Sequence, residues 1–260
     1  MEQFLGKEWE IIPAGGATGE AFYAIYNEQR LFLKRNSSPF LAVLSAEGIV
    51  PKLVWTKRVE NGDVITAQQW LNGRSLKQDE MQNERVIKLL QKIHRSEPLL
   101  SLLEKIEKKA ITPKSLLNKT IQSLSEDWLN NHTIKKAIDF LQKEINNIPT
   151  QYKTVCHCDV NHNNWLLTET NELYLIDWDG ANIGDPAMDL GMLLYQYVPK
   201  DKWMDWLKVY GWEVTEELLL RMKWYTLCQL IAFISFYENK NNEKEVEKDL
   251  HLIEQILLQN

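Results

Sequence analysis

Residues 157–164 read HCDVNHNN, and residues 176–179 read IDWD. Asp159 and Asn164 have four residues between them, and Asp177 follows after a stretch long enough for one small hairpin. A carboxylate such as Asp159 can orient a hydroxyl group and take its proton. The side-chain oxygens of Asn164 and Asp177 are hard ligands that suit Mg²⁺. The stretch therefore predicts a loop built to work on a hydroxyl beside a divalent cation.

The order Asp, Asn, Asp is also that of protein-kinase catalytic loops, where it carries phosphoryl transfer. That reaction depends mainly on charge neutralisation and alignment. We expect Asp159 to act on the acceptor hydroxyl, Asn164 and Asp177 to hold metal, and Asp179 to bind metal directly or through water. Asp and Asn also cap turns, but several matched positions in this order make capping alone the weaker explanation.

Other side chains of the loop have supporting or open roles. Asn161 and Asn163 compete with Asn164 as metal ligands, but only Asn164 has the kinase spacing from Asp159. We expect His157 to hold the loop by hydrogen bonds rather than to transfer protons. His162 is either near the substrate or a solvated loop residue, and the sequence does not decide between the two.

Cys156 and Cys158 flank His157, which raises the possibility of a metal site. Residues two apart on an extended segment point to opposite faces, and no second Cys or His cluster completes a set of four ligands. We therefore expect two small side chains packed around the loop.

The bulk composition is that of an ordinary globular protein. The chain has 260 residues, of which 44% are hydrophobic and 25% charged, with a formal net charge of -6. This charge argues against direct nucleic-acid binding. The first residues lack a signal-peptide pattern, the near-apolar stretch 227–236 is too short to span a bilayer, and three cysteines make a disulfide framework unexpected. We expect a cytoplasmic protein.

The first seventy residues read as strands and the rest mostly as helices, which predicts an α+β, bilobal, protein-kinase-like fold. Short runs rich in Ile, Tyr, Phe and Leu predict strands, and Asn61-Gly62 predicts a hairpin with a type I′ turn. A short helix is expected over 38–48. The expected strands are 9–13, 20–26, 30–34, 53–60 and 64–70.

Beyond residue 71 the hydrophobic period becomes helical. Apolar residues at i, i+3, i+4 and i+7 predict amphipathic helices around 86–93 and 134–141. A small hairpin, 165–167 with 173–176, interrupts the helices, which resume near 187. We expect a nucleotide-binding lobe over 1–71 and a helical lobe with the catalytic loop and acceptor site over 72–260.

A glycine-rich segment between two expected strands is a candidate phosphate-binding loop. Backbone N–H groups at Gly16 and Gly19 and the Thr18 hydroxyl could cover phosphates. Glycine-rich hairpins are common turns, so the signal alone is weak. No Gly-Lys-Ser/Thr follows, which disfavours a P-loop fold.

Further nucleotide contacts are expected after this loop. Lys34 ends an apolar run as a phosphate-binding lysine would, and Glu47 on the following helix is its expected ion-pair partner. Gln69 and Leu71, at the lobe junction, are expected to present backbone groups to the adenine ring.

Two features remain in the second half of the chain. In residues 184–190, GDPAMDL, we expect Asp185 to cap the next helix and Asp189 to brace the catalytic loop. The C-terminal helices are rich in aromatic residues, which either pack in the core or wall an acceptor pocket that stacks on a sugar or holds a cation. These residues are Tyr195, Tyr197, Trp203, Trp206, Tyr210, Trp212, Trp224 and Tyr225.

With these residues in place, the chain resembles the aminoglycoside phosphotransferase and choline kinase group of the protein-kinase-like fold. The resemblance rests on residues 157–164, 176–179 and 184–190, and extends to Lys34, Glu47 and 68–71. Trp165, Trp178 and residues 93–96 (IHRS) make it most similar to a Gram-positive branch of cell-cycle regulators of replication initiation.

The resemblance implies ATP with Mg²⁺ and phosphorylation of a small-molecule hydroxyl. For the closer branch it implies a pentose such as ribose or 2-deoxyribose, or a related metabolite, and cell-division or replication-initiation proteins as partners. Cys158 stands where the group usually has glycine. We expect it to alter the loop or the acceptor pocket without abolishing catalysis.

Other functions remain as alternatives. A regulatory protein-binding module could keep the kinase fold, although it would not require Asp159, Asn164, Asp177 and Lys34 together. An aminoglycoside kinase, which would favour a strongly acidic pocket, and a choline kinase are further alternatives. Nothing in the sequence resembles the phosphorylated activation segment of a protein kinase.

Overall fold

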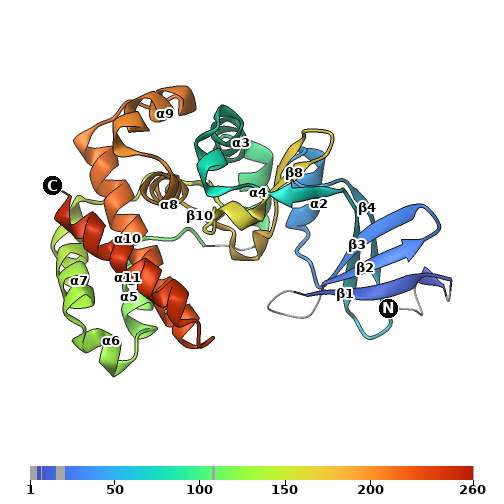
Figure 1. The fold of residues 1–260 in the computed structure, drawn as a ribbon, viewed down its shortest axis with the longest axis horizontal. Coiled ribbons are helices and arrows are strands. Elements are labelled where there is room, and N and C mark those ends of the chain that lie inside the picture. The colour runs from blue at the N-terminus through green and yellow to red at the C-terminus, as the bar shows by residue number, and fades with distance from the viewer. Residues whose placement is uncertain (1–4, 7, 16–20, 107–108, 260) are drawn as a thin grey trace. The chain divides into compact units, whose positions relative to one another are not determined.

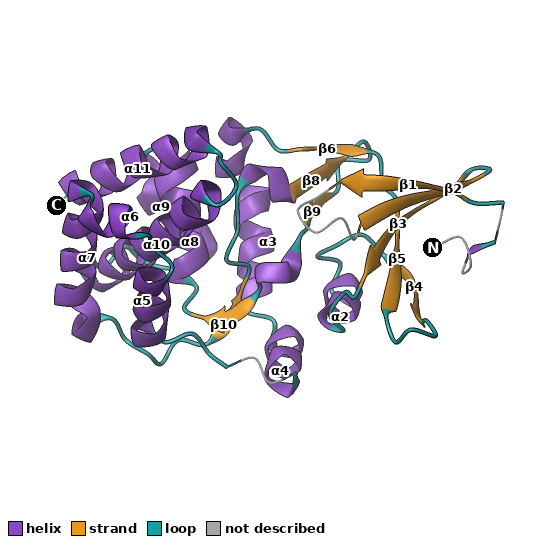
Figure 2. Ribbon diagram, turned by 90° about the horizontal axis from the view of Figure 1, so that it is seen from below, coloured by secondary structure: helices purple, strands orange, loops and turns teal. Residues whose placement is uncertain are grey.

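The computed structural model describes residues 5–6, 8–15, 21–106 and 109–259. These residues form two compact units. The first comprises the described residues up to 76 together with 163–179, and the second comprises the described residues between 77 and 162 together with 180–259. The first unit therefore combines two segments that are not contiguous in the sequence. Strands predominate in the first unit and helices in the second (Figure 2).

An antiparallel sheet of five described strands, in the order β1-β2-β3-β5-β4, forms the first unit (Figure 1). Alternation along the strands places Ala24, Leu33 and Ala67 on one face, where they are fully buried. Each expected strand is present, with ends that differ by a residue or two. Their bounds are β1 Glu10–Gly15, β2 Ala21–Tyr26, β3 Gln29–Arg35, β4 Leu53–Arg58 and β5 Val64–Gln69.

The turn between β4 and β5 differs from the expected type I′ turn. That turn needs positive φ at both central residues, and here Gly62 has a φ of 90° whereas Asn61 is not among the described positive-φ residues. The Gly62 N–H donates to the Val59 carbonyl, and the Asn61 side chain accepts from the Asp63 N–H at 3.1 Å. The type I′ prediction is wrong because the Asn61 side chain stabilises a different turn.

A helix and a small sheet complete the first unit. The helix α2 spans Phe40–Ala46, and the sheet has the order β6-β8-β9, with strands Gly73–Ser75, Trp165–Thr168 and Leu173–Leu175. The Leu175 N–H donates to the Ile49 carbonyl at 3.0 Å, and the Trp178 ring packs edge-on against Phe40. These contacts hold the predicted hairpin, and with it Asp177, in the first unit.

The second unit is mainly helical and contains both predicted amphipathic helices, α3 and α7. Its two-stranded sheet joins β7 to β10. The helix and strand bounds are α3 Glu84–His94, α4 Glu97–Lys105, α5 Pro113–Gln122, α6 Glu126–Asn130, α7 His132–Glu144, β7 Thr154–Cys156, β10 Asn182–Gly184, α8 Ala187–Tyr197, α9 Trp203–Tyr210, α10 Glu216–Glu238 and α11 Glu243–Leu258. The short 3₁₀ turns of the chain are Gln78–Gln82, Ile145–Asn147, His162–Asn164, Trp178–Gly180 and Lys200–Lys202.

The core of the second unit centres on α10, which packs against α8 and α11 (Figure 1). Gly191 on α8 lets the two helices approach closely, because a Cβ there would collide with the Thr226 hydroxyl on α10. Asp185 accepts from the Ala187 N–H at 2.9 Å, which confirms the predicted cap of α8. Arg221 of α10 binds both oxygens of Asp185, and this buried pair ties α10 to the start of α8.

The antiparallel sheet and helical unit confirm the predicted α+β class. No helix within the described residues has the length and apolar character needed to cross a membrane.

Candidate active site

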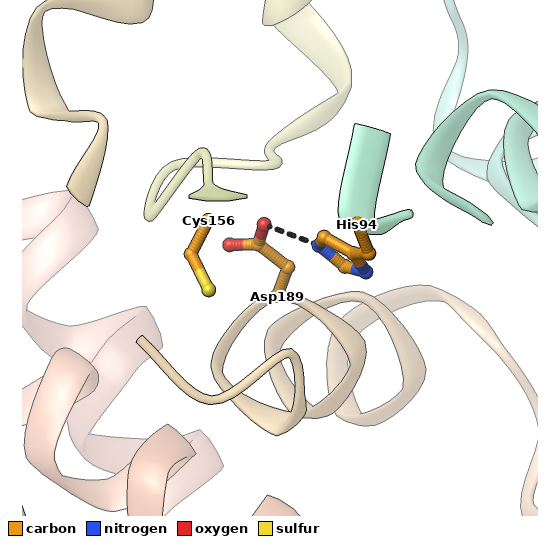
Figure 3. A group of neighbouring side chains, drawn as sticks. All are labelled: His94, Cys156 and Asp189. Carbon is orange, nitrogen blue, oxygen red and sulfur yellow. Dashed lines mark hydrogen bonds and ion pairs between the residues drawn. The ribbon is translucent and has the colours of Figure 1, made fainter. Parts of the chain in front are cut away.

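The predicted catalytic loop, residues 157–164, follows β7. Asp189 on α8 braces it through hydrogen bonds. One oxygen of the buried Asp189 carboxylate accepts from the His157 N–H at 2.7 Å, and the other accepts from the Cys158 N–H at 2.8 Å. His94 Nε2 on α3 lies 3.0 Å from Asp189 Oδ2 (Figure 3). These bonds confirm the predicted bracing role of Asp189.

The charge state of Asp189 suits this role. Burial raises the pKa of Asp189, but the hydrogen bond and electrostatic interaction with His94 and the interactions with His157 outweigh it, so the pKa is lower than usual. The carboxylate therefore stays ionised at neutral pH and is a strong acceptor for the loop N–H groups.

His94, Cys156 and Asp189 form a group whose potential ligand atoms lie within 4.8 Å of one another (Figure 3). Burial raises the pKa of the Cys156 thiol well above its usual value, and its sulfur donates to the Asp185 carbonyl. A protonated thiol and a carboxylate already engaged on both oxygens are poor metal ligands. The group therefore serves as a hydrogen-bonded brace.

Neighbouring side chains fix the loop around Asp159. The buried His157 accepts from the Asp159 N–H through Nδ1 at 3.2 Å, which confirms its predicted structural role. Asn161 donates to Asp159 Oδ1 at 2.6 Å and so orients the carboxylate. The His162 ring and N–H both contact the Tyr197 hydroxyl at 3.2 Å. His162 is therefore a packed loop residue rather than a solvated one.

Cys158 has a backbone conformation that suits glycine. Its φ is +66°, in the left-handed region that costs an L-residue roughly 1–2 kcal/mol because Cβ crowds the following carbonyl. A glycine avoids this cost. The hydrogen bonds from the Cys158 N–H and the His157 N–H to Asp189 hold Cys158 in this strained conformation.

We expect the variant Cys158→Gly to be more stable than Cys158→Ala by about 1 kcal/mol, because only glycine removes the Cβ that causes the strain. Chemical denaturation of the two variants measures the difference directly. Equal stability, or a more stable alanine variant, would contradict strain at this position.

A pocket in the second unit adjoins Asp159. It occupies about 380 Å³ including its solvent-filled mouth, and only about 30 Å³ of it is wide enough to admit water. The catalytic loop, α8, α10 and the N-terminal half of α11 form its walls. Its lining residues are Asp159, Val160, Asn161, Met192, Gln196, Tyr197, Phe233, Tyr237, Glu245, Lys248 and Asp249.

Asp249 is the most unusual of these residues. It is 3% exposed, and its Oδ2 is buried without a hydrogen-bond partner. Burial raises the pKa of Asp249 from 3.8 to about 7; the charge of Lys248 opposes this rise and that of Glu245 adds to it. The pocket thus contains a buried carboxyl group in addition to the carboxylates of Asp159 and Glu245.

The raised pKa of Asp249 predicts that the stability of the folded protein depends on pH. Between about pH 4 and 7 the folded protein binds the Asp249 proton more tightly than the unfolded chain does, so stability falls as the pH rises through this window. An asparagine amide in its place would not titrate. We expect the stability of Asp249→Asn relative to wild type to increase by about 1–3 kcal/mol between pH 5 and pH 8. Urea unfolding at the two pH values checks this, and a constant difference would contradict the raised pKa.

In the first unit, Lys34 on β3 meets the two acidic residues that follow β9. Its ammonium nitrogen lies 2.6 Å from Asp179 Oδ2 and 3.7 Å from Asp177 Oδ1. The side chains of Asp177 and Asp179 are 58% and 63% exposed. Two accessible carboxylates that hold one cation in common can also converge on a divalent ion. The structure therefore brings together three of the predicted site residues.

Asp177 and Asn164 are joined through the backbone. The Ile176 N–H donates to the Asn164 carbonyl at 2.8 Å, so the residue before Asp177 is fixed to Asn164. Asp177 itself has a φ of +63°. Non-glycine residues in this region cluster at functional sites, where surrounding contacts hold them.

Among the described residues, Lys34 does not form the expected ion pair with Glu47. Lys34 binds Asp177 and Asp179 instead, and Glu47 is the C-terminal cap residue of α2, where its N–H donates to the Val43 carbonyl. The prediction of a Lys34–Glu47 pair is wrong for this structure because two other carboxylates lie within reach of the ammonium group.

The remaining predicted nucleotide contacts are placed only in part. Gly16, Thr18 and Gly19 lie outside the described residues. Gln69 is the last residue of β5, where its N–H donates to the Lys52 carbonyl, and Leu71 follows in an irregular segment.

Sequence reasoning missed most of the pocket. Of the eight aromatic residues singled out in the C-terminal helices, only Tyr197 lines it, whereas Trp203, Trp206, Tyr210, Trp224 and Tyr225 are buried in the core. Asp249 could have been found, because it interrupts an apolar helical stripe formed by Val246, Ile253 and Ile256.

The solved structures with a similar fold include several phosphotransferases. The choline kinase LicA from Streptococcus pneumoniae is 16% identical, with a TM-score of 0.69 over 98% of this chain and 96% of that one. The spectinomycin phosphotransferase APH(9)-Ia, solved with ADP and spectinomycin, is 13% identical, with a TM-score of 0.69 over 95% and 92%. A thermostable mutant of the aminoglycoside phosphotransferase APH(4)-Ia is 14% identical, with a TM-score of 0.70 over 99% and 98%. At these identities the likeness shows a shared kinase-like fold.

A family model gives the assignment. The model of the phosphotransferase enzyme family (APH) matches residues 10–224, which include Lys34, the catalytic loop and Asp177. This match covers most of the sequence, and the chain belongs to the phosphotransferase enzyme family.

Proposed function

We propose that the protein is an ATP- and Mg²⁺-dependent kinase that phosphorylates a hydroxyl group of a small molecule. The observation that carries the proposal is the position of Asp159. It lies in a braced loop, its carboxylate is oriented by Asn161, and it lines a pocket. Membership of the phosphotransferase enzyme family supports the same reaction.

Residues of the first unit are suited to hold the nucleotide and its metal. Asp177 and Asp179 offer carboxylates that already bind the Lys34 ammonium group, and Asn164 adds an amide oxygen. Mg²⁺, when bound, neutralises charge that develops on the phosphate oxygens. Lys34 would bind phosphate oxygens once Asp177 and Asp179 turn to the metal. The same proposal assigns further nucleotide contacts to the main chain at Gly16, Gly19, Gln69 and Leu71 and to the Thr18 hydroxyl.

Asp159 acts at the acceptor. Its carboxylate accepts a hydrogen bond from the acceptor hydroxyl, aligns the oxygen and takes the proton late in the transfer. The hydroxyl oxygen forms a bond to the γ-phosphorus as the bond to the bridging oxygen of ADP breaks. The acceptor phosphate ester and ADP are the products.

The acceptor we favour is a pentose such as ribose or 2-deoxyribose, or a related metabolite. The sequence resemblance to the cell-cycle branch supports this choice, and with it a role in division and replication control in the cytoplasm through cell-division or replication-initiation proteins. Choline is the second candidate, because Phe233, Tyr237 and Asp249 give the pocket aromatic and acidic walls. Each of these acceptors requires the walls of the narrow pocket to move apart, and a multi-ring aminoglycoside requires the largest movement.

The experiment is an acceptor panel. ADP release is measured with Mg²⁺-ATP and ribose, 2-deoxyribose, nucleosides, choline or aminoglycosides, each with and without EDTA. We expect one class to stimulate ADP release in a Mg²⁺-dependent manner. Tight nucleotide binding without stimulation by any acceptor would favour a regulatory protein-binding module instead.

A further inference from the structure

Asp249 has a carboxylate oxygen without a partner in the pocket that contains Asp159. It lies on the inward face of α11, is 3% exposed, and its Oδ2 forms no hydrogen bond with the part of the chain that the structure describes. An unpaired buried carboxylate is costly, and native structures usually explain such a group by a ligand, ion or catalytic role. Its position in a pocket points to a ligand.

The cation that lines the pocket pairs with another acid. Lys248 also lines the pocket, but its ammonium nitrogen lies 3.0 Å from Glu245 Oε2, one turn earlier on the same helix. Lys248 and Glu245 therefore largely neutralise each other. The remaining acidic side chains of the pocket are Asp159 and Asp249, and no cation of the lining is left over to attract an anionic acceptor.

The other walls show what chemistry the pocket can bind. Asn161 and Gln196 carry amides that both donate and accept hydrogen bonds, and Tyr197 and Tyr237 carry hydroxyls that do the same. A quaternary ammonium group has no N–H or O–H for these groups to bind. A compound with several hydroxyls can donate to the carboxylates and accept from the amides. The aromatic rings can pack against the apolar face of a sugar.

We propose that Asp249 is a specificity-determining residue that binds a second hydroxyl of the acceptor, one that does not receive the phosphoryl group. The acceptor is then an uncharged polyhydroxyl compound, and the walls of the narrow pocket must move apart to admit it. This inference rests on the proposed kinase function. Asp159 aligns the reacting hydroxyl, and Asp249, on a different element, fixes the orientation of the rest of the molecule.

The test compares wild type with Asp249→Ala, Asp249→Asn and Glu247→Gln in the full chain. Glu247 is an exposed acid on the same helix outside the pocket and serves as the matched control. KM for ribose, 2-deoxyribose, choline and ATP is measured for each. We expect Asp249→Ala to raise the KM of the sugar by about 10- to 100-fold, the effect of losing a hydrogen bond to a charged group.

If Asp249 only stabilised the fold, its substitution would not raise KM for the sugar alone. KM for ATP should be unchanged, Asp249→Asn should lie between wild type and Asp249→Ala because its amide oxygen still accepts, and Glu247→Gln should match wild type. If Asp249→Ala does not fold, Asp249→Asn provides the comparison, with a raised KM for the sugar still expected.

The outcomes separate the two proposals. Sugar phosphorylation by wild type with an unchanged sugar KM in the Asp249 variants would overturn this inference and leave the kinase function standing. Phosphorylation of choline but of neither sugar would overturn the polyhydroxyl class. Failure of wild type to phosphorylate any acceptor in the wider panel would overturn the proposed function, and this inference with it.

Discussion

Replacing Asp159 with asparagine should lower kcat for acceptor phosphorylation by about 10²–10⁴-fold, the range for losing a general base. Asparagine has nearly the same shape and keeps an oxygen that can accept the hydrogen bond from Asn161, so the loop should hold its conformation. It cannot take the acceptor proton. Nucleotide affinity should stay near the wild-type value, because the proposed ATP ligands are in the other unit. Steady-state kinetics and calorimetric titration with an ATP analogue measure the two effects.

The matched control is Asp139→Asn, which changes the same side chain at an exposed position on α7. It should leave kcat and thermal stability at wild-type values. Full activity in Asp159→Asn would remove Asp159 from the reaction and with it the basis of the proposed mechanism.

Replacing Asp177 with asparagine should weaken Mg²⁺-dependent nucleotide binding by at least about tenfold, or about 1.4 kcal/mol. The carboxylate is a harder, charged ligand, and an amide oxygen compensates poorly for it. Asparagine is the appropriate substitution because Asp177 has a φ of +63°, a conformation that Asn adopts readily. An alanine variant would add backbone strain to the loss of the ligand. Calorimetric titration with ATP in the presence of Mg²⁺ measures the change in affinity.

The same titration in EDTA separates metal binding from misfolding. Without divalent cations, wild type and Asp177→Asn should bind ATP equally weakly, since only the metal-dependent part of the affinity is lost. Identical affinity of the two proteins in the presence of Mg²⁺ would contradict a metal-binding role for Asp177.

Local patterns accounted for most of the fold. The two-residue alternation that buries Ala24, Leu33 and Ala67, and the helical period of α3 and α7, are properties of short segments and could be predicted. The brace on the catalytic loop was also predictable, because Asp189 lies in a recognisable segment. The sequence did not predict that residues 163–179 belong to the first unit. This depends on the pairing of β6 with β8, which are far apart along the chain.

The sequence did not predict site contacts between residues that are far apart along the chain. The order of Lys34 and Glu47 along the chain predicted that they would pair. In the structure the Lys34 ammonium group binds Asp177 and Asp179 instead, which are distant in sequence but close in space. Asp249 stands out as an acid in an apolar stripe of α11, yet nothing local shows that this stripe faces the pocket of Asp159. Such contacts depend on how helices pack.

The most direct test of the central claim is to follow the γ-phosphoryl group itself. Wild type and Asp159→Asn are incubated with Mg²⁺ and γ-labelled ATP plus the acceptor that best stimulates ADP release, and the products are separated and identified by mass spectrometry. The account predicts that wild type places the label on an acceptor hydroxyl, with ADP formed in equal amount, and that Asp159→Asn does so hundreds of times more slowly or not at all. Label found only as inorganic phosphate, or equal transfer by the two proteins, would contradict it.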